Sequence, residues 1–519
     1  MRSNSLCRAG VLIHNPLMQS IIALFLLATI FCGSAYGVGG DILGQYSHVL
    51  NGKQEAMAVA VDNDGTMIIT GYTLDSYEDF FTIKIAADGN SMLWASPKTF
   101  DLSGGSDIAI GVVIDSQSNV IVTGSAFNGS DFDFHTIKYD GDDGSVIWQN
   151  TYNGPNGGHN YPKSIALDNL DNIYIGGYTP GTSGPDDFLV IKYNASGPIG
   201  GRPTWAKTYN NVSADNHDRV NAIAVSSGNP AYIAVTGISN NDVNFDVLTV
   251  KYDEDGTQIW AEIYPGSSND DAGKDVKIDS SDDVIVTAEV YNGTFDIYTV
   301  KYTGNAASAV VDWQITYNGG NVDSPTSLIL DSADNVYVTG TTWTSAGKTD
   351  IFTAKYYGTG VSKGSPAWPA KIYDSGDDNS DTPTGIALDS SSVYVTGYTH
   401  NSTRGDDDFR TIKYQRDNGN QSWTVAFDGG LNKNDKALGI GLSSSGDLYV
   451  AGWIDNTPAT DYDFKAIKYN PGALNTPTNL VLTLVTENLV RLDWTVNSTG
   501  EEGFHVFRKI GAFDPWPDT

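Results

Sequence analysis

The chain has 519 residues, a formal net charge of −32 and two cysteines. With 62 Asp and Glu against 30 Lys and Arg, its long-range field repels phosphate backbones and anionic lipid surfaces. This charge argues against nucleic acid as a partner. Beyond the N-terminal segment, no stretch is apolar enough to insert the mature chain in a membrane.

Residues 1–37 have the order of a secretory signal peptide. Arg2 and Arg8 precede an apolar run from Leu17 to Cys32, and small residues follow up to Gly37. A charged region, an apolar core and small residues before a cleavage site are typical of export signals. We therefore expect a secreted, extracellular or cell-surface protein, with the periplasm as a further compartment. Both cysteines lie in this segment, so the mature chain would have no disulfide.

From residue 38 to 470 one unit recurs eight times. In a representative copy, an apolar run from Ser164 to Asp168 is followed by Asn172–Tyr178, Asp187–Tyr193 and Thr204–Tyr209. Each run alternates or is β-branched and is bounded by Gly, Asn, Asp or Pro, as in strands joined by tight turns. The unit therefore predicts a four-stranded antiparallel sheet.

The third strand carries the most regular part of the repeat, an Asp and a Lys five positions apart. All eight copies have it: Asp79–Lys84, Asp133–Lys138, Asp187–Lys192, Asp246–Lys251, Asp296–Lys301, Asp350–Lys355, Asp408–Lys413 and Asp463–Lys468. Eight equivalent pairs around a ring are not one active site. We predict instead that each Lys lays its stem between blades and meets an Asp or a carbonyl there.

The fourth strand, which carries a Trp, follows only seven units, and its missing copy is predicted at the other end of the chain. Leu43–Gly52 resembles this strand and precedes the first unit. Pairing with the strand of Lys468 would close the ring and remove its exposed edges. The prediction is thus all-β: an eight-bladed β-propeller over residues 38–470, with the first strand of each unit innermost.

Residues 471–476 are predicted as a linker, and residues 477–519 resemble the beginning of a fibronectin type III β-sandwich. Pro477–Leu480, Leu489–Trp494 and Gly503–Arg508 correspond to its first three strands. Three strands do not bury a sandwich core. We therefore expect either a fragment of a longer modular protein or a poorly ordered tail.

The Gly-Tyr-Thr triplet after the second strand, the Asp-Phe-x-x-Ile-Lys-Tyr motif and the following Trp resemble the bacterial SBBP β-propeller repeat over about residues 43–470. The resemblance implies a secreted or surface protein, fibronectin-type neighbours and no general enzymatic activity. The family's name refers to seven blades, whereas eight units are present here.

A second, partial resemblance concerns the hairpin Tyr139–Trp148. It has the Asp, Gly and Trp spacing of the tryptophan-docking motif of eight-bladed quinoprotein dehydrogenases. The motif's Thr is absent, and so is the vicinal cysteine pair that these enzymes tend to use. We interpret the spacing as hairpin geometry, with the Trp packed between blades.

Candidate binding residues follow the last glycine of the second strand. This position is aromatic in four units, as Tyr72, Tyr178, Tyr398 and Trp453. Three of these units are neighbours in a closed ring, on the face where propellers usually bind ligands. Aromatic rings there suit stacking on sugars or on aromatic side chains. The alternative interpretation is ordinary packing between blades.

The sequence predicts no catalytic residue, no metal site and no cofactor. Its histidines form no zinc motif, and no nucleophile elbow is present. Acidic turns such as Asp253–Gly256, Tyr139–Gly144 and Asp374–Asp381 offer oxygen ligands for calcium, but the same residues also favour tight turns. The sequence therefore leaves both interpretations of these turns open, calcium binding and turn formation.

These features favour a non-enzymatic, monomeric ring that acts as a binding or scaffold module for glycan or protein ligands. The alternative is a propeller enzyme, either quinoprotein-like or polysaccharide-degrading. An enzyme needs one or two blades whose unique polar groups converge on the channel. Similar loops occur instead around all eight units.

Overall fold

The computed structural model describes residues 6–12, 40–48, 53–455, 462–471, 478–486 and 489–495, with gaps at 183, 212–216, 265, 267–268, 305–306, 346–347, 377–379 and 431–432. The chain divides into two units, Ile42–Tyr469 and a smaller one of Met1–Asp41 with Asn470–Thr519. Within the described ranges no helix is long and apolar enough to cross a membrane.

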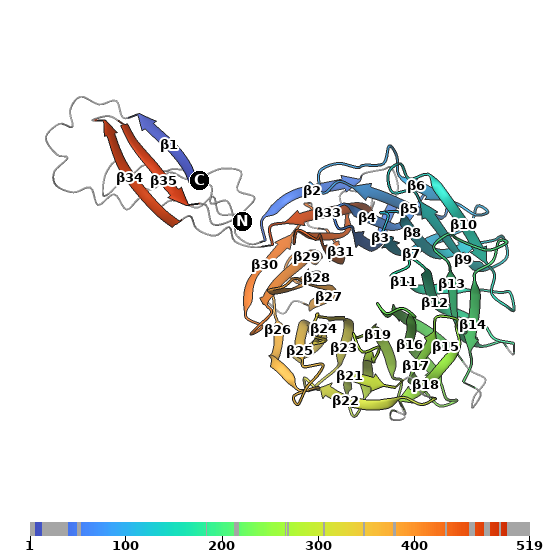
Figure 1. Ribbon diagram of the computed structural model, residues 1–519. Coiled ribbons are helices and arrows are strands. Elements are labelled where there is room, and N and C mark those ends of the chain that lie inside the picture. Colours follow the sequence, from blue (N-terminus) through green and yellow to red (C-terminus); the bar gives the residue numbers. More distant parts are fainter. Residues whose placement is uncertain are drawn as a thin grey trace. The chain divides into compact units, whose positions relative to one another are not determined.

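The larger unit is a ring of eight four-stranded antiparallel sheets, which confirms the predicted β-propeller (Figure 1). We number the sheets as blades 1 to 8 in chain order. They are β3–β6 (Lys53–Val61, Met67–Leu74, Glu78–Ile85, Lys98–Phe100), β7–β10 (Asp107–Ile114, Val120–Phe127, Phe132–Tyr139, Val146–Tyr152), β11–β14 (Tyr161–Leu167, Ile173–Pro180, Asp186–Tyr193, Trp205–Tyr209), β15–β18 (Asp218–Val225, Tyr232–Asn240, Phe245–Asp253, Gln258–Tyr264), β19–β22 (Ala272–Ile278, Val284–Tyr291, Phe295–Thr303, Val310–Tyr317), β23–β26 (Asp323–Leu330, Val336–Ser345, Lys348–Tyr356, Pro366–Tyr373), β27–β30 (Ser380–Leu388, Ser392–Asn401, Asp406–Gln415, Gln421–Phe427), and β31–β33 with β2 (Asp435–Leu442, Leu448–Asp455, Tyr462–Tyr469, Ile42–His48).

The ring closes as predicted, because the N-terminal strand β2 is the outer strand of blade 8. It pairs antiparallel with β33, and Gly44 lies opposite Lys468 where other blades place their Trp. A Cβ at Gly44 would lie 1.8 Å from the carbonyl oxygen of Asp88 in blade 1. The glycine therefore lets the hairpin of blade 1 approach the closing strand.

The hydrophobic core consists of eight clusters, one between each pair of adjacent blades. Between blades 8 and 1, Phe464 and Phe81 meet edge to face with ring centroids 5.1 Å apart, and Tyr449 and Ile83 join the same cluster. Both faces of each blade are thus covered by apolar neighbours. The closure is packed like every other interface.

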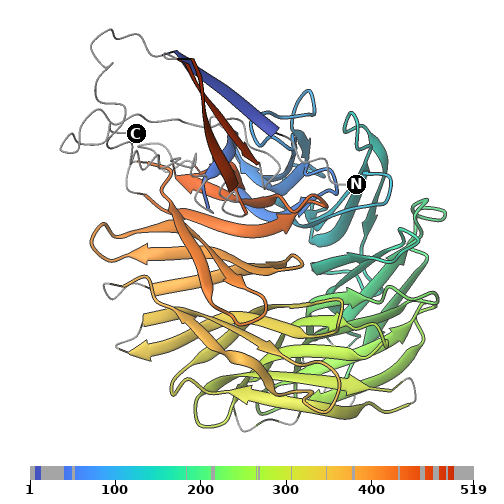
Figure 2. The ribbon, with the colours of Figure 1, turned by 60° about the vertical axis from the view of Figure 1, so that its left-hand side comes forward.

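The first strand of each blade lies nearest the centre of the ring and the fourth lies outermost, as predicted, and Figure 2 shows successive blades face to face. Every first strand carries one extra residue opposite its partner: Met57, Ile110, Lys163, Asn221, Lys274, Thr326, Thr384 and Leu438. Such a β-bulge bends the strand and re-aims a side chain.

The bulge explains the repeated glycine of the second strand. A Cβ at Gly71 would lie 2.0 Å from the carbonyl oxygen of Glu55, and one at Gly397 would lie 1.9 Å from that of Thr382. The bulged first strand therefore presses its backbone onto this position. Blade 5 differs from the other seven blades, because Ala288 places a Cβ at this second-strand position.

The repeated lysine ties neighbouring blades together, as predicted. Lys84 donates to the carbonyl of Gly141 at 2.9 Å, and Lys468 donates across the closure to that of Ala87 at 3.1 Å. Equivalent bonds to the next blade join Lys138 to Ala195, Lys192 to Glu254 and Lys355 to Arg416. The blade-5 lysine, Lys301, instead pairs with Asp279 and Asp283 of its own blade.

The smaller unit contains one antiparallel sheet of β1 (Leu6–Leu12), β35 (Leu489–Thr495) and β34 (Thr478–Thr486), in that order. The predicted strand Leu489–Trp494 lies within β35, and Pro477–Leu480 overlaps only the beginning of β34, whereas Gly503–Arg508 and most of the predicted linker lie outside the described residues. The signal peptide and the fibronectin type III assignment stay predictions.

Candidate functional site

The predicted aromatic residues lie near one face of the ring. Each blade is antiparallel, so its second strand ends, its third begins and its first begins at the same edge. This edge also carries the connection from the fourth strand to the next blade. We call it the crossover face.

Three of the predicted aromatics belong to one continuous row, which we call the three-blade strip. In order across blades 7, 8 and 1 it consists of Tyr398, Lys436, Trp453, Tyr462, Lys53 and Tyr72. The ammonium of Lys436 lies 4.3 Å from the ring centre of Tyr398 and 5.9 Å from that of Trp453. The rings of Trp453 and Tyr462 are 4.2 Å apart, and Lys53 bridges Tyr462 and Tyr72 at 4.7 and 5.7 Å. Two lysine ammonium groups are therefore interleaved with four aromatic rings over three blades.

The three-blade strip is electrically balanced. Lys436 pairs with Asp407 at 3.1 Å, and Lys53 pairs with Glu55 at 3.0 Å. The Tyr72 hydroxyl donates to the same Glu55 carboxylate at 2.5 Å, and burial, then this carboxylate, raises the pKa of Tyr72 to about 12. The phenol is therefore protonated at neutral pH.

The members of the strip differ in exposure. Tyr398 and Tyr72 are partly exposed, whereas Trp453 is only 6% exposed. The packing interpretation thus describes Trp453, whose ring lies near that of Tyr462, while Tyr398 and Tyr72 are only partly buried.

The fourth predicted aromatic, Tyr178 in blade 3, is not part of the strip. Its ring lies 5.3 Å from that of Tyr161, its partner on the first strand. The guanidinium of Arg219 in blade 4 is 5.1 Å from the Tyr178 ring centre, and the ammonium of Lys163 is 5.7 Å from it. This second site combines two cations with neighbouring aromatic rings.

Sequence reasoning found the aromatics but missed their cations. Lys436 lies directly opposite Trp453 on the first strand, and Arg219 occupies the same position in blade 4. The first-strand residue opposite the aromatic position was the signal that could have revealed them.

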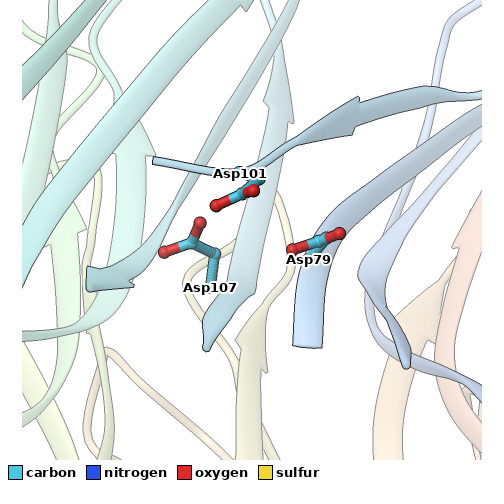
Figure 3. A group of neighbouring side chains, drawn as sticks. All are labelled: Asp79, Asp101 and Asp107. Carbon is cyan, nitrogen blue, oxygen red and sulfur yellow. The ribbon is translucent and has the colours of Figure 1, made fainter. Parts of the chain in front are cut away.

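Acidic residues gather at a different place, between blades on the crossover face. Asp79, Asp101 and Asp107 converge from β5, the crossover and β7 (Figure 3), each offering an oxygen within 4.8 Å of the others. Two equivalent groups occur among the described residues: Asp350 with Asp374 and Asp381, and Asp408 with Asp428 and Asp435. Of the three acidic turns that offer oxygen ligands for calcium, only Asp374–Asp381 contributes to such a group among the described residues. In another, Asp253 accepts backbone bonds from Asp255 and Thr257, as a turn requires.

At the position of Asp107, Asp381 and Asp435, on the first strand or directly before it, every blade has a buried polar residue. The eight are Gln54, Asp107, Asn160, Asp218, Asp271, Asp323, Asp381 and Asp435, each at most 1% exposed. Each of the six aspartates accepts a backbone N–H bond from the preceding crossover, from its own second strand or from both. In five of the six cases the aspartate therefore joins its first strand to the crossover from the preceding blade.

Burial makes these carboxyl groups weak acids. It raises the pKa of Asp107 to about 6 and that of Asp435 to about 7, with further increases from neighbouring carboxylates. In the group of Asp408, Arg404 supplies a counter-charge through ion pairs with Asp408 and Asp428. Carboxylate oxygens suit calcium chemically, but the backbone donors already account for the Asp107 carboxylate, and we assign no metal.

No family model and no curated protein matches the chain, so the resemblance to the SBBP repeat stays a prediction. Several solved propellers are similar in fold. Sqt1 of Chaetomium thermophilum bound to the N-terminus of the ribosomal protein L10 is 10% identical, with a TM-score of 0.52 over 83% of this chain and 99% of that chain. The Dos1 propeller is 8% identical, with a TM-score of 0.52 over 83% and 95%. A quinohemoprotein alcohol dehydrogenase from Comamonas testosteroni is 12% identical, with a TM-score of 0.47 over 86% and 78%. At these identities the likeness concerns the fold alone.

Proposed function

We propose that this protein is a secreted or cell-surface, non-enzymatic propeller that binds glycan or protein ligands through its crossover face. The observation that carries the proposal is the three-blade strip, in which lysine ammonium groups are interleaved with aromatic rings. Partly exposed tyrosines with polar tips suit sugar rings and aromatic side chains. The balanced charge of the strip favours neutral ligands.

The strip is well placed for recognition because its residues stand on strands. Lys436 and Trp453 are cross-strand partners in blade 8, and Glu55 and Tyr72 are partners in blade 1. Binding groups on regular strands are held more precisely than groups on loops. A similar propeller, Sqt1, is bound to the N-terminus of another protein, so a peptide is an alternative ligand to a glycan.

The remaining features of the proposal follow from charge and closure. A net charge of −32 disfavours nucleic acid and anionic membranes. Because the closed ring covers both faces of every blade with its neighbours, no blade in the described part of the chain keeps a bare apolar face for a second copy, so we propose a monomer. The proposal needs no cofactor.

The test is a glycan and peptide array probed with the full chain, followed by titration of each hit. We expect Tyr398→Ala and Tyr72→Ala each to weaken binding about tenfold, because each removes one stacking surface. Tyr357→Ala is the matched control, since this tyrosine is 41% exposed in a hairpin at the opposite face. Unchanged affinity in the Tyr398→Ala/Tyr72→Ala double variant would refute the proposal.

The enzymatic alternative predicts a different result with the same hits. A dehydrogenase would reduce an electron-accepting dye in the presence of its substrate, and a polysaccharide-degrading enzyme would shorten the bound glycan. Turnover that is lost in the Tyr398→Ala variant would replace the binding proposal by the enzymatic one.

A further inference from the structure

Two sites on the crossover face share one framework: Tyr178, Arg219 and Asp186 between blades 3 and 4, and Tyr398, Lys436 and Asp407 between blades 7 and 8. In each, the cation of the following blade lies near the tyrosine ring of the preceding blade, at 5.1 and 4.3 Å. In each, that cation also pairs with the aspartate, at 2.6 and 3.1 Å. The framework is therefore balanced in charge at both places.

The two sites differ in the bulge residue of the first strand. In blade 7 this residue is Thr384, whose hydroxyl donates to the carbonyl of Ala437 at 2.9 Å. In blade 3 it is Lys163, whose ammonium lies 5.7 Å from the Tyr178 ring centre. Within the described part of the chain, no carboxylate forms an ion pair with Lys163. The blade-3 site thus carries one additional positive charge.

This additional charge is held in an unfavourable setting. Partial burial of the Lys163 ammonium, and then repulsion from Arg219, lower the pKa of Lys163. The Lys163 residue is nevertheless exposed overall, and the Arg219 side chain is 38% exposed, so solvent reaches both. A bound anion would relieve this repulsion and accept charge-assisted hydrogen bonds.

Further aromatic rings adjoin Tyr178. Tyr161 lies 5.3 Å from Tyr178, and Phe132 of blade 2 lies 5.6 Å from Tyr161. The site therefore combines positive charge with aromatic rings. A uronic acid matches both, because its carboxylate is attached to a pyranose ring that can stack on tyrosine. An acidic peptide side chain has the carboxylate but no ring.

We propose that Tyr161, Lys163, Tyr178 and Arg219 form a subsite for a uronic acid residue of an acidic glycan. Lys163 and Arg219 bind the carboxylate, and the tyrosines contact the sugar ring. This subsite rests on the proposed glycan-binding function and names one ligand class for it. The three-blade strip, whose lysines are paired, takes neutral parts of a ligand.

The test is calorimetric titration of the full chain with a galacturonic acid trimer, its fully methyl-esterified form and a pentaglutamate peptide. We expect the acid trimer to bind, the ester to bind at least tenfold more weakly and the peptide not to bind. Lys163→Thr, which copies the blade-7 site, should lose at least tenfold in affinity, and Lys163→Arg should retain it. Lys274→Thr, at the same bulge position in blade 5, is the control.

The proposal fails if no trimer binds at millimolar concentration, if the ester or the peptide binds as well as the acid, or if Lys163→Thr binds like the unaltered chain. The comparison of acid with ester needs no variant and decides the matter even if Lys163→Thr does not fold. Neutral hits that depend on Tyr398 would persist if only this subsite were wrong. If no neutral ligand that depends on Tyr398 were found either, the proposed function would also be refuted.

Discussion

The buried carboxyl group of Asp107 should make the propeller less stable as the pH rises. Asp107 is 0% exposed and accepts backbone N–H bonds from Leu102 at 2.7 Å and Phe127 at 2.6 Å. Burial, with Asp101 and Asp79 nearby, raises its pKa from 3.8 to about 6. At about 1.4 kcal/mol per pKa unit, this shift corresponds to ~3 kcal/mol.

The sign follows from the direction of the shift. Because the folded-state pKa lies above the unfolded-state value, the native state holds the proton more tightly. The stabilisation is complete below pH 3.8 and is lost as the pH rises through about 6. We therefore expect the free energy of unfolding to fall from about pH 3.8 to about pH 6 and to level off above that. Asp435, with a pKa of about 7, adds to the same trend.

Denaturant unfolding of Asp107→Asn and of the unaltered chain at pH 5 and pH 8 measures this contribution. Asn cannot ionise, but it replaces an acceptor by a donor, so we expect the variant to be about 1–3 kcal/mol less stable at pH 5. Because about one pH unit separates pH 5 from the folded-state pKa of about 6, the deficit should shrink by ~1.4 kcal/mol between pH 5 and pH 8. Asp142→Asn, at an exposed hairpin position, is the control. An Asp107→Asn variant with the same pH dependence as the unaltered chain would contradict the reasoning.

Three further predictions test the closure of the ring and the acidic groups on the crossover face. Lys468→Met removes the bond to the Ala87 carbonyl across the closure together with the ion pair to Asp447, and should cost about 1 kcal/mol, measured by denaturant unfolding; an unchanged midpoint would mean that neither contact contributes. Gly44→Ala places a Cβ 1.8 Å from the Asp88 carbonyl oxygen; it should lower the melting temperature and speed proteolysis of the N-terminal strand, and a variant as resistant as the unaltered chain would show that the hairpin can move aside. Calcium at millimolar concentration should leave the melting temperature unchanged, because backbone donors already satisfy Asp107; a rise that Asp79→Asn abolishes would establish a metal site.

Much of the architecture was predictable because it is local and repeated. Eight copies of an Asp and a Lys five residues apart identified eight equivalent third strands, and the seven tryptophans showed that one outer strand was missing. Leu43–Gly52 was recognisable as its replacement even though Gly44 stands where the other units have Trp. Strand periodicity and turn residues depend on near neighbours, so they are readable along the chain.

The candidate sites depended on contacts between blades, which the sequence does not display. Tyr398 meets Lys436 from the next blade, and Tyr462 meets Lys53 across the closure. Neither lysine differs from an ordinary surface lysine in its local pattern. Only the closed ring brings these residues together.

The sequence by itself therefore determined the strands, the number of blades and the way in which the ring closes. The tertiary structure decided which charges accompany each aromatic ring, and hence that the Tyr398 site is balanced while the Tyr178 site carries the additional Lys163. The physical reason is that electrostatic balance depends on distances between side chains of different blades. Those distances exist only after the blades have packed.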